Sequence, residues 1–346
     1  MADLLKLNGM TLFSGAEVSL TLPENKIGVV LGGAESGKGE LLRRISGLIP
    51  FAEGEIFLRG DLIARSGKSP TPRERNIEMV LQEGGFYPHL NLLENLKLGL
   101  QKYRINNKSQ HCMHVLAELG LDGLARHYPA ALNREQLRYL LIARALATRP
   151  ALLLLEEPLL DLSVEARYTF LDRLPQIVEA FDCGILLSTQ VRQGVLFAGD
   201  YAGVMEHEIL LQWDSPQNLY LIPKKRTVAH YMGEGVLVKG VVHDDLRLDT
   251  ELGMVDHPSG FGLPTGTRLE LLIRPEDIVF DEKARRRARI VQRAVHGGKT
   301  FYRLQLTPEL EIERAFSSYL DERISGELRY RLEIRSMVLF KRKKSS

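Results

Sequence analysis

A glycine-rich segment near the start of the chain has the residue types that bind phosphate. It reads Gly32-Gly33-Ala34-Glu35-Ser36-Gly37-Lys38-Gly39, with the spacing G-x-x-x-x-G-K. Glycines at this spacing let backbone N–H groups turn inward toward phosphate oxygens, and the lysine reaches the β and γ phosphates of a nucleotide. An apolar run before the segment and an amphipathic stretch after it favour a strand–loop–helix phosphate site over a chance glycine-rich turn.

Three residues weaken this site chemically. A phosphate loop of this kind has Ser or Thr after the lysine, whose hydroxyl binds Mg²⁺, but this chain has Gly39. Glu35 within the loop and Glu40 after it would each repel a triphosphate by about 1–3 kcal/mol at a separation of ~6 Å and an effective dielectric of ~20. We therefore expect the backbone geometry of a phosphate loop with weakened metal and phosphate binding.

Alternating apolar and amphipathic segments predict the elements that position this loop. Short apolar runs at residues 27–31, 151–155 and 184–188 predict buried strands, and residues 40–48 predict a helix. This alternation is typical of an α/β fold with a largely parallel sheet. Residues of about 90 to 148 have leucine, alanine and charged residues at helical spacing, which predicts a helical insert in the α/β core.

After residue 232 the pattern changes to short alternating segments punctuated by glycine and proline. Such a pattern predicts a small β barrel or sandwich. We therefore expect two domains, at residues 1–232 and 233–346. The length of 346 residues agrees with this division, since single domains usually have roughly 100–200 residues.

Composition and charge exclude several classes of protein. The mean hydropathy of −0.12 and the lack of an apolar run near the ~18–20 residues that cross a bilayer exclude a transmembrane subunit. The two cysteines, Cys112 and Cys183, predict a reducing compartment, and the first residues do not resemble a secretory signal. A formal net charge of +2 argues against a nucleic-acid partner, because a polyanion usually requires a strong basic excess.

Several further segments, taken in chain order, resemble the ATP-binding subunits of ABC importers of the type with a C-terminal regulatory β domain. They are residues 75–82, 86–90, 142–147, 153–158 and 273–278. Residues 153–158 resemble the Walker B motif, and residues 273–278 contain the Arg-Pro-Glu-Asp sequence of that regulatory domain. The resemblance implies a P-loop NTPase core of ABC type with a helical subdomain, followed by a small all-β domain of the OB or TOBE-like kind.

The resemblance also implies roles for single residues. Gln82 would sense Mg²⁺ and the γ-phosphate, Glu156 would support Mg²⁺, and Glu157 would polarise the attacking water. Phe13 lies where the family stacks an aromatic ring on adenine. The residues expected to contact nucleotide or metal are Phe13, Gly32, Gly33, Ala34, Glu35, Ser36, Gly37, Lys38, Gly39, Glu40, Gln82, Leu132, Asn133, Gln136, Glu156 and Gln190.

The chain departs from the family at several of these positions. The family's Leu-Ser-Gly-Gly-Gln signature, which reaches across a dimer to the other subunit's nucleotide, is replaced by Leu132-Asn133-Arg134-Glu135-Gln136. Glu156 replaces the Walker B aspartate, and Gln190 replaces the switch histidine. The loss of the Mg²⁺ hydroxyl, of the imidazole or of the signature donors is each expected to slow hydrolysis by ~10²-fold or more.

These patterns predict the energy-coupling subunit of an ABC importer that binds ATP and Mg²⁺ and hydrolyses ATP slowly. The alternative is a pseudo-ATPase, a structural or regulatory subunit in a heterodimer with an active paralogue. The expected partners are membrane permease subunits, a second ATP-binding subunit and, indirectly, an external solute-binding protein. The chain would lie as a peripheral subunit on the cytoplasmic face of the inner membrane, and the resemblance slightly favours ferric iron among the cargoes.

Overall fold

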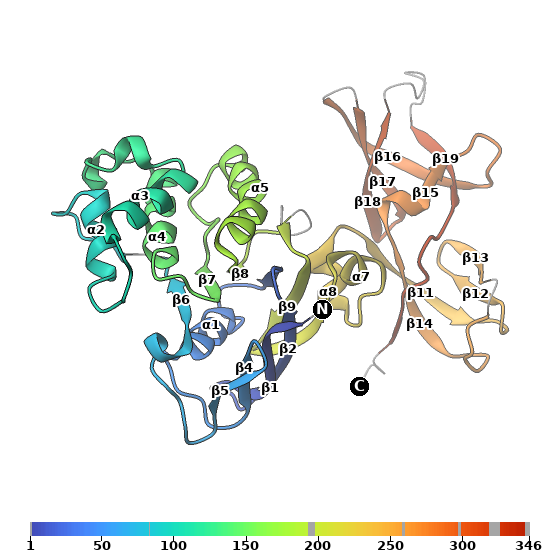
Figure 1. Cartoon of the computed structure of the whole chain (residues 1–346). Coiled ribbons are helices and arrows are strands. Elements are labelled where there is room, and N and C mark those ends of the chain that lie inside the picture. The colour runs from blue at the N-terminus through green and yellow to red at the C-terminus, as the bar shows by residue number, and fades with distance from the viewer. Residues whose placement is uncertain are drawn as a thin grey trace. The chain divides into compact units, whose positions relative to one another are not determined.

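The structure is a computed structural model that describes residues 2–82, 84–192, 198–257, 260–296, 299–317 and 326–342. Contacts among the described residues divide the chain into two units, Met1–Leu219 and Tyr220–Ser346 (Figure 1). The division precedes the boundary expected at residue 232 because Ala229 packs with Leu272 and Phe340 of the second unit. The two domains with a boundary at residue 232 stay a prediction.

A six-stranded sheet forms the core of the first unit. Its strands lie in the order β10-β9-β3-β8-β7-β6, and every neighbouring pair is parallel except β10 with β9. The strands are β3 (Ile27–Leu31), β6 (Ile77–Val80), β7 (Leu152–Glu156), β8 (Gly184–Thr189), β9 (Tyr201–Glu206) and β10 (Ile209–Asp214). All residues of β3, β7 and β8 are buried, as is typical of parallel strands covered on both faces. The predicted α/β fold is confirmed.

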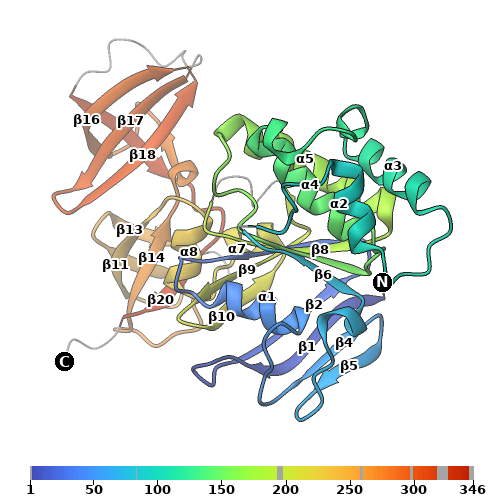
Figure 2. The ribbon, with the colours of Figure 1, turned by 90° about the vertical axis from the view of Figure 1, so that its left-hand side faces the viewer.

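A second, antiparallel sheet lies on the other side of helix α1 (Lys38–Ser46) from the central sheet (Figure 2). Its strands lie in the order β2-β1-β4-β5, with bounds Asp3–Thr11 for β1, Glu17–Pro23 for β2, Glu55–Leu58 for β4 and Asp61–Arg65 for β5. Leu41, Leu42 and Ile45 of α1 are fully buried in one apolar cluster with residues of both sheets. This packing holds α1, and with it the loop that precedes the helix, against the central sheet.

The helices between β6 and β7 form the predicted insert. They are α2 (Leu92–Gly99), α3 (Lys108–Glu118) and α4 (Arg134–Leu146), with 3₁₀ turns at Asp122–Leu124 and Pro129–Ala131. Another 3₁₀ turn, Pro72–Arg75, precedes β6, and α5 (Val164–Phe181) connects β7 to β8. The helical subdomain expected in this part of the chain is confirmed.

The second unit contains two antiparallel sheets of five strands each. Their strand orders are β13-β12-β11-β14-β20 and β15-β19-β16-β17-β18. The bounds are β11 (Val236–Val242), β12 (Arg247–Thr250), β13 (Gly253–Asp256), β14 (Arg268–Ile273), β15 (Ile278–Phe280), β16 (Arg286–His296), β17 (Lys299–Thr307), β18 (Leu310–Ser317), β19 (Glu327–Leu332) and β20 (Leu339–Lys341). Residues of both sheets, such as Val238 and Leu328, share one apolar core, which confirms the small all-β domain.

Two short helices and the Arg-Pro-Glu-Asp segment join the strands of this region. Helix α7 (Pro216–Leu221) spans the division between the units, and α8 (Arg226–Met232) precedes β11. The 3₁₀ turn Pro275–Asp277 follows Arg274, whose buried guanidinium donates to the carbonyl oxygens of Ala229 at 3.1 Å and Glu234 at 2.8 Å. This arginine therefore ties α8 to the start of the β domain.

Candidate functional site

The glycine-rich segment forms a loop between β3 and α1, as its sequence predicts. Gly37 begins the helix with φ +89, a left-handed conformation that glycine adopts without strain. At Gly32 a Cβ atom would lie 2.5 Å from the Met205 carbonyl oxygen, so only glycine fits beside β9. Within the loop, Ser36 Oγ donates to the Gly33 carbonyl oxygen at 2.8 Å. The backbone therefore places the loop at the carboxyl end of β3, where open α/β sheets bind ligands.

A cavity of about 360 Å³ lies beside this loop. Its lining includes most of the residues expected from the sequence, which come from the loop, from Gln82, from the end of β7 and from the end of β8. The lining residues are Ala34, Glu35, Gly37, Lys38, Gly39, Glu40, Arg43, Gln82, Glu156, Glu157, Ser188, Gln190 and Glu208. The fold thus gathers residues separated by up to half of the chain around one hollow.

The lysine of the loop is paired with a carboxylate in this cavity. Lys38 Nζ lies 2.8 Å from Glu157 Oε1, and the two side chains are only 4% and 9% exposed. Lys38 also donates to the Gly33 carbonyl oxygen at 2.8 Å, and Glu157 Oε2 accepts from the Gln190 backbone N–H at 3.1 Å. A phosphate group that binds Lys38 must therefore compete with Glu157 for the ammonium.

The Glu156 carboxylate, next to Glu157 in sequence, is held by an arginine. Arg43 Nη2 lies 2.7 Å from Glu156 Oε1 and 2.9 Å from Oε2, so one nitrogen meets both carboxylate oxygens. Gly39 makes room for this contact, because a Cβ atom there would lie 2.6 Å from Glu156 Oε1. The helical spacing of four residues between Gly39 and Arg43 places both on one face of α1.

The residues expected to bind Mg²⁺ do not fit the ion. Gly39 has no hydroxyl to offer, and the Glu156 carboxylate is already neutralised by the Arg43 guanidinium. Gln82 lines the cavity but contributes only a neutral amide. The part of the chain that the structure describes contains no group of three or more His, Cys, Asp or Glu side chains arranged to hold a metal ion.

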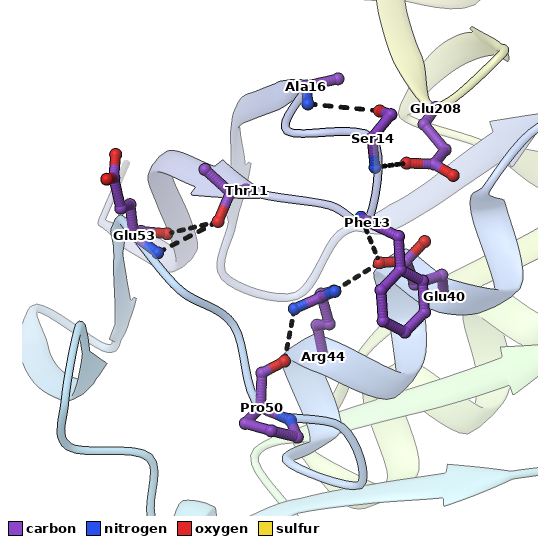
Figure 3. Close-up of polar contacts among 9 residues, drawn as sticks. All are labelled: Thr11, Phe13, Ser14, Ala16, Glu40, Arg44, Pro50, Glu53 and Glu208. Atoms are coloured by element: carbon purple, nitrogen blue, oxygen red, sulfur yellow. Dashed lines mark hydrogen bonds and ion pairs between the residues drawn. The ribbon is translucent and has the colours of Figure 1, made fainter.

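Phe13 is held beside the cavity by residues of α1 (Figure 3). The Phe13 backbone N–H donates to Glu40 Oε1 at 2.9 Å, and Arg44 Nε lies 2.5 Å from the same oxygen. The Arg44 guanidinium lies 4.5 Å from the centroid of the Phe13 ring, whose side chain is nevertheless 72% exposed. The ring is thus backed by a cation on one side and open to solvent on the other, as a base-stacking platform requires.

Glu208 connects the segment that contains Phe13 and Ser14 to the phosphate loop. Its carboxylate accepts from the Ser14 backbone N–H at 2.6 Å (Figure 3). Its backbone N–H donates to the Ser36 carbonyl oxygen at 2.9 Å. The hydrogen bond from Ser14 holds the pKa of Glu208 below its usual value, so this carboxylate stays charged. Glu208 therefore adds a negative charge to a site that is already acidic.

The charges that line the cavity are predominantly negative. The carboxylates are Glu35, Glu40, Glu156, Glu157 and Glu208, and the cations are Lys38 and Arg43. Both cations, and Arg44 behind Glu40, are engaged in ion pairs of 2.5–2.8 Å. The site can accept a polyphosphate only where these ion pairs open or where a cation serves two anions at once.

The expected signature residues lie outside this cavity. Asn133 is the N-cap of α4: its side chain accepts from the Gln136 backbone N–H at 2.8 Å, and the Gln136 side chain accepts from the Asn133 N–H at 3.0 Å. This reciprocal pair is a capping box, and it is preceded by Leu132, the C-cap of the 3₁₀ turn Pro129–Ala131. Within one chain these residues serve to begin a helix, and their contact with nucleotide stays a prediction.

Three lining residues were missed by the sequence analysis. Arg43 had a readable signal, because it lies one helical turn after Gly39. Ser188 lies beside Glu156 in the sheet, and its buried hydroxyl has no hydrogen-bond partner among the described residues. Glu208 belongs to a turn between β9 and β10 that is far from the loop in sequence, and nothing in its local pattern indicated the contact.

Comparison with known proteins establishes the family. Residues 16–160 match the family model described as "ABC transporter". The Fe(3+) ions import ATP-binding protein FbpC 2 of Pectobacterium atrosepticum is 30% identical over 278 residues, which are 80% of this chain and 78% of that protein. The chain belongs to the ATP-binding subunits of ABC importers. Among the helices that the structure describes, none has both the length and the apolar character that crossing a bilayer needs.

Other relatives and solved structures agree with this importer ATP-binding subunit. The Fe(3+) ions import ATP-binding protein FbpC of Escherichia coli K12 is 29% identical over 286 residues, which are 80% of this chain and 78% of that protein. The molybdate/tungstate import ATP-binding protein WtpC of Pyrococcus horikoshii is 28% identical, with 82% and 80% covered. The structure of cbiO1 from Clostridium perfringens has a TM-score of 0.58 and 18% identity and covers 64% of this chain and 91% of that one, which shows the ABC fold.

Proposed function

We propose that this importer subunit binds ATP in the cavity beside residues 32–39 and hydrolyses it slowly. The observation that supports the proposal is the single cavity that Lys38, Gln82, Glu157 and Gln190 line together. The adenine would stack on the open side of the Phe13 ring, and the triphosphate would lie along the loop toward Lys38. Binding of ATP would release Glu157 from Lys38 as a phosphate takes its place.

Slow hydrolysis follows from the groups that surround the expected γ-phosphate position. Glu157 keeps the carboxylate that would orient water, but it is bound to the cation that should stabilise the transferred phosphate. Gln190 contributes a backbone N–H to Glu157 and has no imidazole. In a dimer, Arg134 and Glu135 of this chain stand where two glycines would let its backbone approach the phosphate bound by the second subunit. Catalysis by preorganised donors is therefore reduced at each of these places.

The proposed assembly contains two ATP-binding subunits and membrane permease subunits. In it, closure of the two ATP-binding subunits on nucleotide moves the permeases, which receive cargo from an external solute-binding protein. The chain would lie on the cytoplasmic face of the inner membrane. Ferric iron is the proposed cargo, because two of the similar proteins are named for Fe(3+) import.

A second candidate function is that of a pseudo-ATPase beside an active paralogue. The pairing of each phosphate-site cation with a carboxylate favours it, since binding energy must first be used to open these pairs. The two functions differ in the assembled transporter. Glu157→Gln in this chain lowers transport if its own hydrolysis drives the cycle and leaves transport unchanged if the paralogue alone does so.

Binding of ATP to the purified full-length chain tests the proposal. Equilibrium dialysis with labelled ATP is expected to show saturable binding at or below about 1 mM, a range typical of enzyme–substrate affinities. Phe13→Ala and Lys38→Met should both weaken this binding. Absence of saturable binding at millimolar ATP, in a chain shown to be folded by circular dichroism, would overturn it.

A further inference from the structure

Three residues of the cavity form one interdependent unit. Gly39 leaves a space on α1, the Glu156 carboxylate reaches into that space, and the Arg43 guanidinium closes over it. A Cβ atom on residue 39 would lie 2.6 Å from Glu156 Oε1 and 3.5 Å from Arg43 Nη1. The guanidinium and the carboxylate therefore occupy the place toward which a hydroxymethyl group on residue 39 would point.

We propose that the Arg43 guanidinium replaces the metal ion at this site, so that the chain binds the polyphosphate of a nucleotide without Mg²⁺. This inference rests on the proposed binding of ATP. It concerns what neutralises the phosphates, because Glu156, which is expected to support the metal ion, holds the arginine instead.

The charge and geometry of the pair support this role. The Glu156 side chain is 9% exposed, so its charge requires a partner, and one nitrogen of Arg43 contacts both of its oxygens. A guanidinium has five N–H donors, and this contact uses those of Nη2. Arg43 is 41% exposed and lines the cavity, so its remaining donors are available to an anion that enters. Arginine is suited to such bridging because it binds phosphate oxygens in a planar, bidentate manner.

A divalent cation has little to hold it beside this arginine. Mg²⁺ in nucleotide sites is bound by one or two carboxylates together with the phosphates. Glu156 is paired with Arg43 and Glu157 with Lys38, while Glu40 is bound to Arg44. Glu35 and Glu208 also line the cavity, and the Glu208 carboxylate accepts from the Ser14 backbone N–H. The other donors near the end of β7 are the neutral side chains of Gln82 and Ser188. A dication placed there would also be repelled by the guanidinium.

Titration of the full-length chain with ATP in excess Mg²⁺ and in excess EDTA tests the inference. The two dissociation constants should agree within about threefold, a difference of ~0.7 kcal/mol. Arg43→Ala should weaken binding in EDTA by about tenfold or more, as expected for loss of a charged hydrogen-bond donor. Arg65→Ala is the matched control, because it removes an exposed arginine of β5 from the same unit. It should leave the dissociation constants for ATP in Mg²⁺ and in EDTA unchanged.

The double variant Gly39→Ser with Glu156→Asp restores a hydroxyl and a shorter carboxylate, and it keeps the test decisive if Arg43→Ala does not fold. This double variant should bind ATP about tenfold or more tightly in excess Mg²⁺ than in excess EDTA. If Mg²⁺ tightens ATP binding to the unaltered chain by more than about tenfold, the arginine does not replace the metal. That result overturns this inference and leaves the proposed binding of ATP in place. If ATP binds in neither buffer, the proposed function is overturned together with it.

Discussion

The ammonium nitrogen of Lys38 lies 2.8 Å from Glu157 Oε1, and less than a tenth of either side chain is exposed. The cation that should hold the γ-phosphate therefore neutralises the carboxylate that should orient the attacking water. In the proposed ATP site, a phosphate that displaces Glu157 from Lys38 would free this carboxylate. In that proposal, one ion pair would couple nucleotide binding to the activation of Glu157.

Removal of Lys38 should destabilise the protein as well as weaken ATP binding. Lys38→Met leaves the buried Glu157 carboxylate without its cation, which typically costs about 3–5 kcal/mol. The free energy of unfolding in urea measures the effect. Adding Glu157→Gln to Lys38→Met removes the uncompensated charge and should recover most of the loss. Equal stability of Lys38→Met and the unaltered chain would contradict the importance of this pair.

Gly39 and Glu156 should show strong coupling in a double-mutant cycle. In Gly39→Ser alone the Cβ would lie 2.6 Å from Glu156 Oε1, so the end of this side chain must shift and its ion pair with Arg43 is disturbed, at a cost of about 1 kcal/mol. Glu156→Asp shortens the carboxylate and removes the clash, so the double variant should be more stable than the sum of the single effects by about 1 kcal/mol. Urea unfolding of the four proteins gives the coupling. Additive changes in the free energy of unfolding would show that the two residues do not share this space.

Glu78 should make the stability of the chain depend on pH in a predictable direction. Burial raises the pKa of Glu78 above its usual value of 4.5, and its Oε1 accepts hydrogen bonds from Thr148 at 3.1 Å and Tyr103 at 3.3 Å. Above the raised pKa the folded state bears a charge that is less favourable than in the unfolded state. On acidification the folded state takes up the proton first, and the cost disappears once the pH falls below the unfolded pKa.

Glu78→Gln keeps an oxygen that can accept both hydrogen bonds and removes the charge. The variant should therefore be more stable than the unaltered chain at pH 7, and the advantage should shrink as the pH falls toward 4. Thermal or urea unfolding of both proteins over this pH range measures the difference. If the difference in stability between the two proteins does not change with pH, the pKa of Glu78 is the same in the folded and unfolded states, and the prediction is wrong.

Phe13 should contribute to the recognition of the base and little to the fold. Phe13→Ala is expected to weaken ATP binding by about tenfold, since stacking of a base on an aromatic side chain contributes ~1–3 kcal/mol. Binding of inorganic tripolyphosphate, which has no base, should be unchanged, and Phe13→Tyr serves as the matched control that keeps the ring. Equal weakening of ATP and tripolyphosphate would instead place Phe13 near the phosphates.

The sequence predicted the parallel core because that core follows from local pattern. The apolar runs at residues 27–31, 151–155 and 184–188 differ by at most one residue at either end from β3, β7 and β8. The phosphate loop was also predictable, since glycines and a lysine at fixed spacing determine it. The ion pairs of Arg43 with Glu156 and of Lys38 with Glu157 were not, because their partners are far apart in sequence, 113 positions for Arg43 and Glu156, and meet only through the folding of α1 against β7. The same holds for Glu208, whose contact with Ser14 spans 194 positions.

The Asn133–Gln136 capping box illustrates a different limit. The sequence shows this segment as an altered signature, and the structure shows that its polar side chains begin α4. Both descriptions apply to the same residues, since a segment that begins a helix can also present its end to a second subunit. Only the capping role is visible within one chain.

The central claim is that the chain binds ATP and hydrolyses it slowly. Steady-state ATP turnover of the purified full-length chain at saturating ATP and Mg²⁺ tests it most directly, and the Glu157→Gln variant measures the turnover that does not depend on Glu157. The account predicts saturable ATP binding with a turnover below about 10⁻² s⁻¹, that is ~100-fold or more below the lower end of ordinary enzyme rates. A Glu157-dependent turnover above about 1 s⁻¹ would contradict it.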